Sequence, residues 1–253
     1  MHVLVTGAAG AIGYAVAGGL EAAGHAVRGF DRAPARRPGD HVVGTLTDRS
    51  ALDLAMRGID TVVHLAATPD RADFLTDLIP NNIAGTYNMF EAAAAAGVRR
   101  VVYASTARVA SGVRPDPSES PISAADGLWP LDLYALTKCC GELMGRIYER
   151  RGLSVICARI GWYPRNRGEV QRMAQSEWGR RVYLSHRDAV HFFRRAVEAP
   201  SVPFVQLFVS SRNDDASAFD LEAAKAAIGY QPIDSFPEGS SFDHSPEFPS
   251  PGR

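Results

Sequence analysis

Tyr134 and Lys138 stand four residues apart in the segment Tyr-Ala-Leu-Thr-Lys, a spacing that puts both side chains on one face of a helix. An ammonium group beside a tyrosine favours the phenolate. Such a tyrosine can take the proton of an alcohol or sugar hydroxyl while hydride leaves the carbon. The pair therefore predicts oxidation of a hydroxyl group, with Tyr134 as the base and Lys138 as its helper.

Two hydroxyl side chains, Ser105 and Thr106, follow the predicted strand 100–104 directly. Parallel strands end at one edge of their sheet, and ligands of open α/β sheets bind at that edge. A hydroxyl there would hold the reacting oxygen of a substrate. Ser105 and Thr106 are therefore candidate catalytic residues together with Tyr134 and Lys138. Tyrosine–lysine pairs also occur on surface helices, so this interpretation depends on the rest of the chain.

Three glycines at a spacing of three, Gly7, Gly10 and Gly13, lie between an apolar strand at 3–5 and an alanine-rich helix at 11–23. Strand, glycine turn and helix are the context of a dinucleotide-binding motif. The glycines allow a tight turn, close approach of a pyrophosphate and close packing of the helix. The N–H groups that begin the helix then face the phosphates.

Asp31 closes a second predicted strand at 25–30, about twenty residues after the glycines. A carboxylate at this position suits the ribose hydroxyls of NAD and repels the additional phosphate of NADP. Arg32 follows directly, and Arg36 and Arg37 lie nearby, so NADP stays open as a less favoured alternative. We predict NAD as the cofactor.

Strand-like and helix-like segments alternate along the chain, which is typical of βαβ units. The predicted fold class is α/β, a doubly wound parallel sheet (Rossmann fold) with a small C-terminal substrate-binding appendage. The predicted parts are an NAD-binding domain with the catalytic residues at 1–161, a small substrate-binding region that completes the sheet at 162–229, and a flexible or surface-wrapping tail at 230–253. Further strands are predicted at 41–46, 61–65, 153–159 and 204–209, and helices at 70–96, 133–151, 170–178, 187–199 and 220–228. We also expect a short helix that Asp48 or Ser50 caps, and a long loop at 107–133.

Composition argues against several other kinds of protein. The 253 residues carry a formal net charge of -1, which gives no attraction to nucleic acid or to an anionic membrane. Three cysteines without zinc-site spacing and seven histidines without a metal-ligand pattern predict no metal site and a reduced, cytoplasmic chain. The first strand begins at the N-terminus and no apolar run reaches the length of a membrane span, so we expect neither a signal peptide nor a transmembrane segment.

Together these pieces resemble the extended short-chain dehydrogenase/reductase superfamily, in its NAD-dependent epimerase/dehydratase branch. The resemblance is carried by residues 6–13, Asp31, 64–67, Asn82, 103–106, Tyr134 and Lys138. Within the branch the chain is most similar to uronate dehydrogenases, through residues 134–142, 158–161, 172–173 and 184–188. This resemblance implies oxidation of the anomeric hydroxyl of a hexuronate to an aldarolactone, with NAD as the hydride acceptor.

The resemblance also implies which residues bind. For the cofactor these are Gly7, Gly10, Ala11, Ile12, Gly13, Asp31, Arg32, Leu46, Leu65, Ala66, Ala67, Asn82, Tyr134, Lys138 and Ile160. For the substrate they are Thr68, Thr106, Trp162 and Arg172, with Arg172 as the partner of the carboxylate. A homo-oligomer that pairs through the helices near 75–96 and 133–151 is implied as well.

The substrate is less narrowly defined than the cofactor. Thr68 stands where the family has a serine, and Trp162 where it has a small residue, so another sugar, a polyol or a secondary metabolite is an alternative substrate. A nucleotide-sugar epimerase shares the motifs, but few residues follow Arg159 to form its substrate domain. A nucleotide-sugar dehydratase has an acidic pair where this chain has Ala107 and Arg108. A non-catalytic NAD-binding protein is the remaining alternative, although such proteins usually lose the tyrosine or the lysine.

Overall fold

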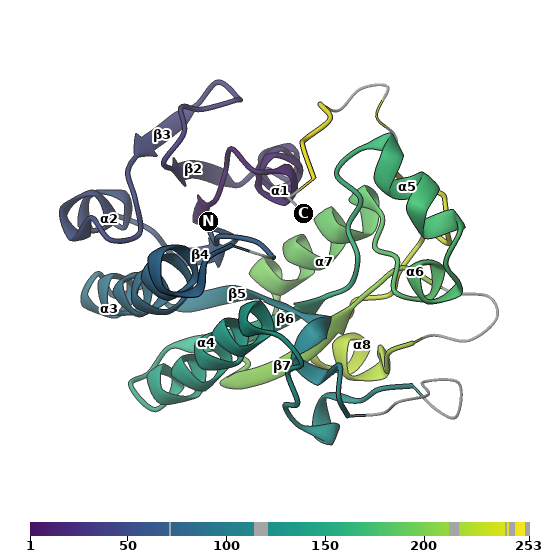
Figure 1. Ribbon diagram of the computed structural model, residues 1–253. Helices are drawn as coiled ribbons and strands as arrows, with labels where there is room; N and C mark the ends of the chain where they lie inside the picture. The colour runs from purple at the N-terminus through teal and green to yellow at the C-terminus, as the bar shows by residue number, and fades with distance from the viewer. Residues whose placement is uncertain (71, 114–120, 213–217, 241, 243–245, 251–253) are drawn as a thin grey trace.

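The structure is a computed structural model that describes residues 1–70, 72–113, 121–212, 218–240, 242 and 246–250. Within these residues the chain forms a seven-stranded parallel sheet in the order β3-β2-β1-β4-β5-β6-β7 (Figure 1). The strands are β1 (His2–Thr6), β2 (Ala26–Asp31), β3 (Asp40–Val43), β4 (Thr61–His64), β5 (Arg100–Thr106), β6 (Ser154–Ile160) and β7 (Phe204–Val209). The strand order reverses at β1, as in doubly wound folds, and the predicted fold class is confirmed.

Helices cover both faces of this sheet (Figure 1). One face carries α1 (Ala11–Ala22), α7 (His186–Glu198) and α8 (Glu222–Ile228), and the other carries α2 (Arg49–Ala55), α3 (Gly85–Ala95) and α4 (Leu133–Glu149). Two short helices, α5 (Arg167–Ala174) and α6 (Glu177–Arg181), follow β6 and stand beyond its carboxyl end. No helix of the described residues is long and apolar enough to cross a membrane.

The strands are apolar on both sides because both faces are covered. In β1, Val3 and Val5 belong to the core under α1 and α7, whereas Leu4 belongs to the core under α2 and α3. All three side chains are fully buried. The register of β5 on β6 pairs Thr106 with Ile160, so both strands end at the same edge of the sheet. The candidate catalytic residues lie at this edge.

Two predicted helices differ from those in the structure. The segment predicted as helix from residue 70 begins at η1 (Phe74–Ala84), a π-helix that contains Pro80 and leads into α3. Asp73 starts it, because its side chain accepts hydrogen bonds from the Leu75 and Thr76 N–H groups. The helix predicted at 170–178 is two helices, because Ser176 caps a new helix and accepts the Gly179 N–H at 3.0 Å.

The long loop predicted at 107–133 contains two short 3₁₀ turns in its described part, η2 (Ala107–Ala110) and η3 (Ala124–Asp126). The segment after α8 lies against the rest of the protein where the structure describes it. Tyr230 is buried, and its hydroxyl donates to the Ser210 carbonyl at 2.9 Å. Asp234 is buried too and accepts the Ser185 hydroxyl at 2.6 Å. These described residues therefore wrap along the protein.

Candidate active site

The glycine turn between β1 and α1 contains backbone approaches that only glycine permits. Gly7 has a φ of +73°, and its N–H donates to the Phe30 carbonyl at 2.8 Å. At Gly13 a Cβ would lie 2.1 Å from the Gly7 carbonyl oxygen. Gly10 is the N-cap residue of α1 and brings no side chain over the first N–H groups of the helix. This turn fits the pyrophosphate of a dinucleotide.

Asp31, the last residue of β2, lies beside this turn. Its carboxylate accepts the Ala9 N–H and the Ala33 N–H, each at 3.0 Å. These bonds fix the carboxylate against the glycine turn, at the position that suits the ribose hydroxyls of a dinucleotide. The residues of the turn and Asp31 thus fit NAD together.

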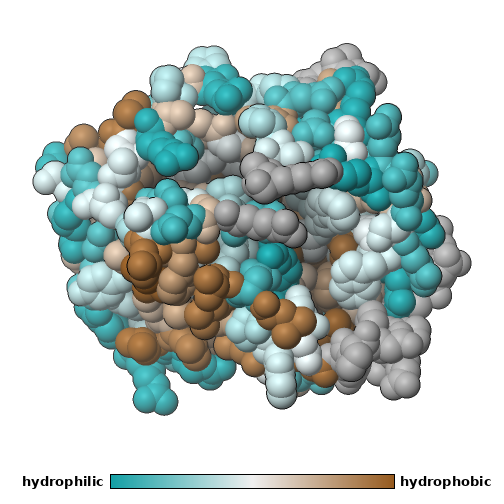
Figure 2. Space-filling view, viewed as in Figure 1, coloured by the Kyte–Doolittle hydropathy of each residue, from teal (hydrophilic) through white to brown (hydrophobic). Residues whose placement is uncertain are grey.

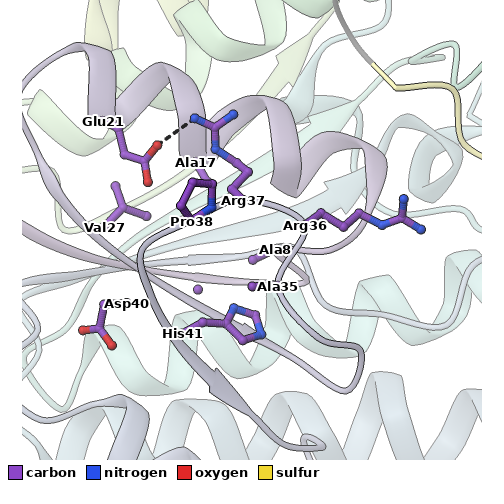
Figure 3. A pocket seen from close by; sticks show the side chains of 11 residues that line it. Ala8, Ala17, Glu21, Val27, Ala35, Arg36, Arg37, Pro38, Asp40 and His41 are labelled. Atoms are coloured by element: carbon purple, nitrogen blue, oxygen red, sulfur yellow. Dashed lines mark hydrogen bonds and ion pairs between the residues drawn. The ribbon is translucent and has the colours of Figure 1, made fainter.

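The arginines after Asp31 differ in their surroundings. Arg32 is exposed. The guanidinium of Arg36 lies 5.0 Å from the centre of the Phe248 ring, and that of Arg37 donates to Glu21 at 2.8 Å. Figure 3 shows Arg37 turned toward Glu21 and Arg36 turned away from it. The side chains of Arg36 and Arg37 both contact other residues of the protein, which agrees with the preference for NAD over NADP.

Helix α4 brings the tyrosine and the lysine to the same edge. Asp132 is its N-cap residue and accepts the Ala135 N–H at 2.8 Å, so the helix begins just before Tyr134. Lys138 is buried, and its Nζ donates to the Ala104 carbonyl of β5 at 2.9 Å. The same Nζ lies 5.7 Å from the centre of the Tyr134 ring. The predicted pair therefore shares one helix face at the end of β5.

Burial changes the acidity of both side chains. It lowers the pKa of Lys138 to about 7, since the ammonium group loses its water, and raises the pKa of Tyr134 to about 12. The positive charges of Arg165 and Arg108 act against this rise and lower the pKa of Tyr134. Burial, together with Lys138, lowers the pKa of the neighbouring His64 to about 3, so this imidazole is neutral. Tyr134 thus needs positive charge close by to act as a base near neutral pH.

The two candidate hydroxyls at the end of β5 differ in their contacts. Thr106 accepts the Arg108 N–H at 3.3 Å. Ser105 donates to the Glu142 carboxylate at 2.6 Å inside a buried network that includes Arg159. Neighbouring strand residues point to opposite sides. The Ser105 hydroxyl already donates to a buried carboxylate, so Thr106 is the better candidate to hold a substrate oxygen, and both assignments stay predictions.

The loop after β4 is held by an asparagine. Asn82 accepts the Thr68 N–H at 2.8 Å, donates to the Thr68 carbonyl at 2.9 Å and reaches the Thr137 hydroxyl of α4 at 3.2 Å. The Ala66 N–H donates to the Thr6 hydroxyl at 3.2 Å. Asn82 therefore ties the loop after β4 to the helix of Tyr134, in addition to any contact with a cofactor.

The remaining residues predicted to contact the cofactor lie at or beside the carboxyl edge. These are Ala11 and Ile12 in the first turn of α1, Leu46 after β3, Leu65 and Ala67 after β4, and Ile160 at the end of β6. Within the described part of the chain, no three side chains of the metal-ligating types lie close enough to hold a metal ion.

Comparison with known families identifies the kind of protein. Residues 3–175 match the model of the NAD dependent epimerase/dehydratase family. The chain belongs to this family. It is an NAD-dependent oxidoreductase, and the predicted family and cofactor are confirmed.

Relatives match nearly the whole chain. L-arabinose 1-dehydrogenase (NAD(P)(+)) from Haloferax volcanii is 36% identical, over 92% of this chain and 96% of the relative. NAD-dependent glucose-6-phosphate dehydrogenase from the same organism is 31% identical, over 93% and 94%. A crystal structure of a mutant uronate dehydrogenase from Agrobacterium tumefaciens complexed with NAD is 28% identical, covers 92% of this chain and 84% of that one, and superposes with a TM-score of 0.78. This epimerase/dehydratase family member is thus similar to sugar dehydrogenases.

Two predicted substrate residues of this family member lie in the region after β6. The Trp162 N–H donates to the Val182 carbonyl at 2.7 Å, and its side chain packs against the cluster that contains Phe208 and Phe219. Arg172, on α5, donates to the Ser250 hydroxyl at 3.2 Å, and 44% of its side chain is exposed. The structure therefore places Arg172 against the C-terminal segment.

Residues not assigned from the sequence surround Tyr134 as well. Arg108 lies 5.4 Å from the centre of its ring and pairs with Asp70 and Asp132. Arg165 is the group that most strongly lowers the pKa of Tyr134. The position of Arg108 two residues after Thr106, at the end of a strand, was the available signal for its nearness to the site.

Proposed function

We propose that the protein oxidises a hydroxyl of a small sugar acid or related carbohydrate with NAD, in the manner of a uronate dehydrogenase. The supporting observation is the pairing of Tyr134 and Lys138 on α4, with Lys138 bonded to the Ala104 carbonyl two residues before Thr106. The glycine turn and Asp31 meet the requirements of the cofactor at the same edge. The sugar dehydrogenases among the relatives support the substrate class.

Each side chain has a distinct task in this proposal. Bound NAD supplies the hydride acceptor. Tyr134, as the phenolate, takes the proton of the substrate hydroxyl and becomes a phenol. Lys138 favours the phenolate by its positive charge. The Thr106 hydroxyl holds the reacting oxygen by a hydrogen bond.

An acidic substrate is proposed on the charge of the region after β6. The partly exposed Arg172 would pair with the carboxylate of a sugar acid through two parallel hydrogen bonds. Thr68, from the loop after β4, would contact substrate hydroxyls. Trp162 would narrow the site and restrict the size of the sugar.

The test measures NADH formation by absorbance. Purified protein is given NAD and a panel of galacturonate, glucuronate, L-arabinose and glucose 6-phosphate, with NADP as a comparison. We expect turnover of a uronate with NAD, and a loss of at least about a thousandfold in kcat for Tyr134→Phe, because a positioned general base and its activation are removed together. Arg172→Gln should raise KM for the uronates and leave that for arabinose unchanged.

The alternatives predict other results. Turnover of arabinose or glucose 6-phosphate alone would keep the dehydrogenase and contradict the acidic substrate. NAD binding without turnover on the whole panel would mean that this oxidoreductase acts on a substrate outside the panel. A bound nucleotide sugar would favour an epimerase.

We also propose that the protein forms a homo-oligomer through α3 and α4. Tyr87 of α3 and Leu136, Leu143 and Ile147 of α4 are exposed apolar side chains. Figure 2 shows hydrophobic surface gathered over these two helices. The cytoplasmic location expected from the sequence stays a prediction.

A further inference from the structure

Arg108 lies between two carboxylates and one aromatic ring. Its Nη1 donates to Asp70 at 2.5 Å, and its Nη2 lies 2.7 Å from Asp132. Its guanidinium carbon is 5.4 Å from the centre of the Tyr134 ring. About 40% of the side chain is exposed, so it borders the open side of the site. Arg108 therefore presents a fixed positive charge to the tyrosine.

Asp70 is held in an uncommon backbone conformation. Its φ is +57°, in the left-handed region that is unfavourable for most L-residues and that aspartate and asparagine tolerate best. The ion pair with Arg108 offsets part of this cost. The loop after β4 is thus fastened to the end of β5 at the entrance of the site.

Arg108 also connects the end of β5 with the start of α4. Its backbone N–H donates to the Thr106 hydroxyl at 3.3 Å. Its side chain bonds Asp132, the residue that caps α4 and so sets where the helix of Tyr134 begins. One residue therefore contacts both the proposed substrate-holding hydroxyl and the start of the catalytic helix.

Charged groups from several elements act on Tyr134. The positive ones are Arg108 of η2, Lys138 of α4 and Arg165 of the loop before α5. The negative ones are Asp70 of the loop after β4 and Asp132 of the α4 cap, and the buried Tyr103 of β5 lies nearby. Arg108 lowers the pKa of Tyr134, whereas Asp70 and Asp132 raise it. Loss of Arg108 would leave the two carboxylates without their shared partner.

We propose that Arg108 is a positioning residue that favours the base form of Tyr134, and that Asp70 is the counter-charge that limits this effect. The inference rests on the proposed role of Tyr134 as the base. Arg108 acts through the tyrosine, by its charge over the ring and by its bond to the helix cap. It does not itself exchange a proton with the substrate.

The experiment compares opposite changes on the two partners. Arg108→Gln should raise the pKa on the acidic side of the kcat/KM profile by about half a unit to one unit, the effect of one nearby charge at a half-exposed position. Asp70→Asn should lower it, because the negative charge is lost while the amide oxygen can still accept from Arg108 and asparagine suits the positive φ. Arg49→Gln, which breaks an exposed Arg–Asp pair on α2, is the matched control and should leave the profile unchanged.

A second readout does not depend on turnover. With tyrosines labelled by ¹³C at Cζ, the signal of Tyr134 is the one lost in Tyr134→Phe, and its titration is followed by NMR in each variant. Shifts of opposite sign for Arg108→Gln and Asp70→Asn support the proposal. Shifts of the same sign, or none, overturn it. If no substrate of the panel turns over while the NMR shifts are opposite, the proposed function fails and the charge arrangement stands.

Discussion

Lys138 is a buried cation whose burial works against folding. The residue is 3% exposed, and its pKa of about 7 in the folded protein lies below the 10.5 of an exposed lysine. The unfolded chain therefore binds more protons than the folded one between these values, so the stability of the cofactor-free protein rises with pH across this window. Below about pH 7 both states carry the proton and the full penalty is present.

We predict that Lys138→Met stabilises the cofactor-free protein at pH 7 by roughly 2 kcal/mol, less than the pKa difference alone implies because the Ala104 carbonyl loses its donor. This advantage should shrink as the pH is raised toward 10. Urea unfolding at several pH values measures it. Lys225→Met, at an exposed position of α8, is the control and should show no such pH dependence. A variant that is less stable than the wild type at pH 7 would contradict the argument.

Single residues also show what the sequence could predict of the site. Tyr134, Lys138 and the glycines lie in short motifs, so their spacing is itself the signal. Arg108 was not predictable in its role, because its partners Asp70 and Asp132 lie 38 and 24 residues away in the sequence. Only the folded chain brings these charges around one ring.

At the scale of elements, the carboxyl end of β5 rests on a buried carboxylate from α4. Glu142 accepts the Ser105 hydroxyl at 2.6 Å, Nε and Nη2 of Arg159 at 3.0 and 2.9 Å, and the Gln206 amide at 2.6 Å. Both members of the Glu142–Arg159 pair are fully buried. Strands β5, β6 and β7 are thus joined to the helix that carries Tyr134.

Glu142→Gln should lower the free energy of unfolding by about 3 kcal/mol, because it leaves the Arg159 guanidinium buried without its counter-charge. Urea unfolding at neutral pH measures this loss. Glu149→Gln, near the end of the same helix, is the control and should change the free energy by less than about 0.5 kcal/mol, as surface changes do. Equal effects of the two substitutions would show that the buried pair contributes no more to the free energy of unfolding than an ordinary glutamate of the same helix.

The prediction of elements succeeded where capping and periodicity agree. Asp48, one of the two caps considered, starts α2 by accepting the Ala51 N–H at 3.0 Å. The π-helix before α3 was not predictable, because Pro80 removes one N–H from the ladder and the sequence alone does not say how the neighbouring carbonyls are then paired. The break between α5 and α6 was missed because Ser176 is a cap in the middle of a helix-like pattern.

At the scale of the whole molecule, the fold followed from the alternation of strands and helices and from the glycine turn. The position of the described C-terminal segment did not follow from the sequence, because contacts with residues far away in the chain hold it in place. Asp234 is buried and contacts Ser185 and Arg187, which lie at the start of α7. A segment rich in proline, serine and glycine shows no periodic pattern from which such contacts could be inferred.

The exposed apolar face of α3 and α4 predicts assembly of the whole molecule. Leu143 and Ile147 are 55% and 60% exposed and lie four residues apart on one helix face. Two copies that pair face to face through such helices would bury these side chains by an isologous contact. Because this face belongs to the helix that carries Tyr134, pairing would also restrict the motion of α4.

We therefore expect the wild type to sediment as a dimer, or as an oligomer built from dimers, in sedimentation velocity. Leu143→Glu should sediment as a monomer, because a carboxylate in the centre of an apolar interface would be buried without a partner. Leu54→Glu on α2, also an exposed leucine, is the control and should keep the wild-type mass. A monomeric wild type at micromolar concentration would contradict the proposed assembly. If Leu143→Glu is monomeric and its kcat falls while NAD binding is kept, pairing between copies helps to hold the helix that carries Tyr134 in its active position. An unchanged kcat would show that the apolar face serves assembly alone.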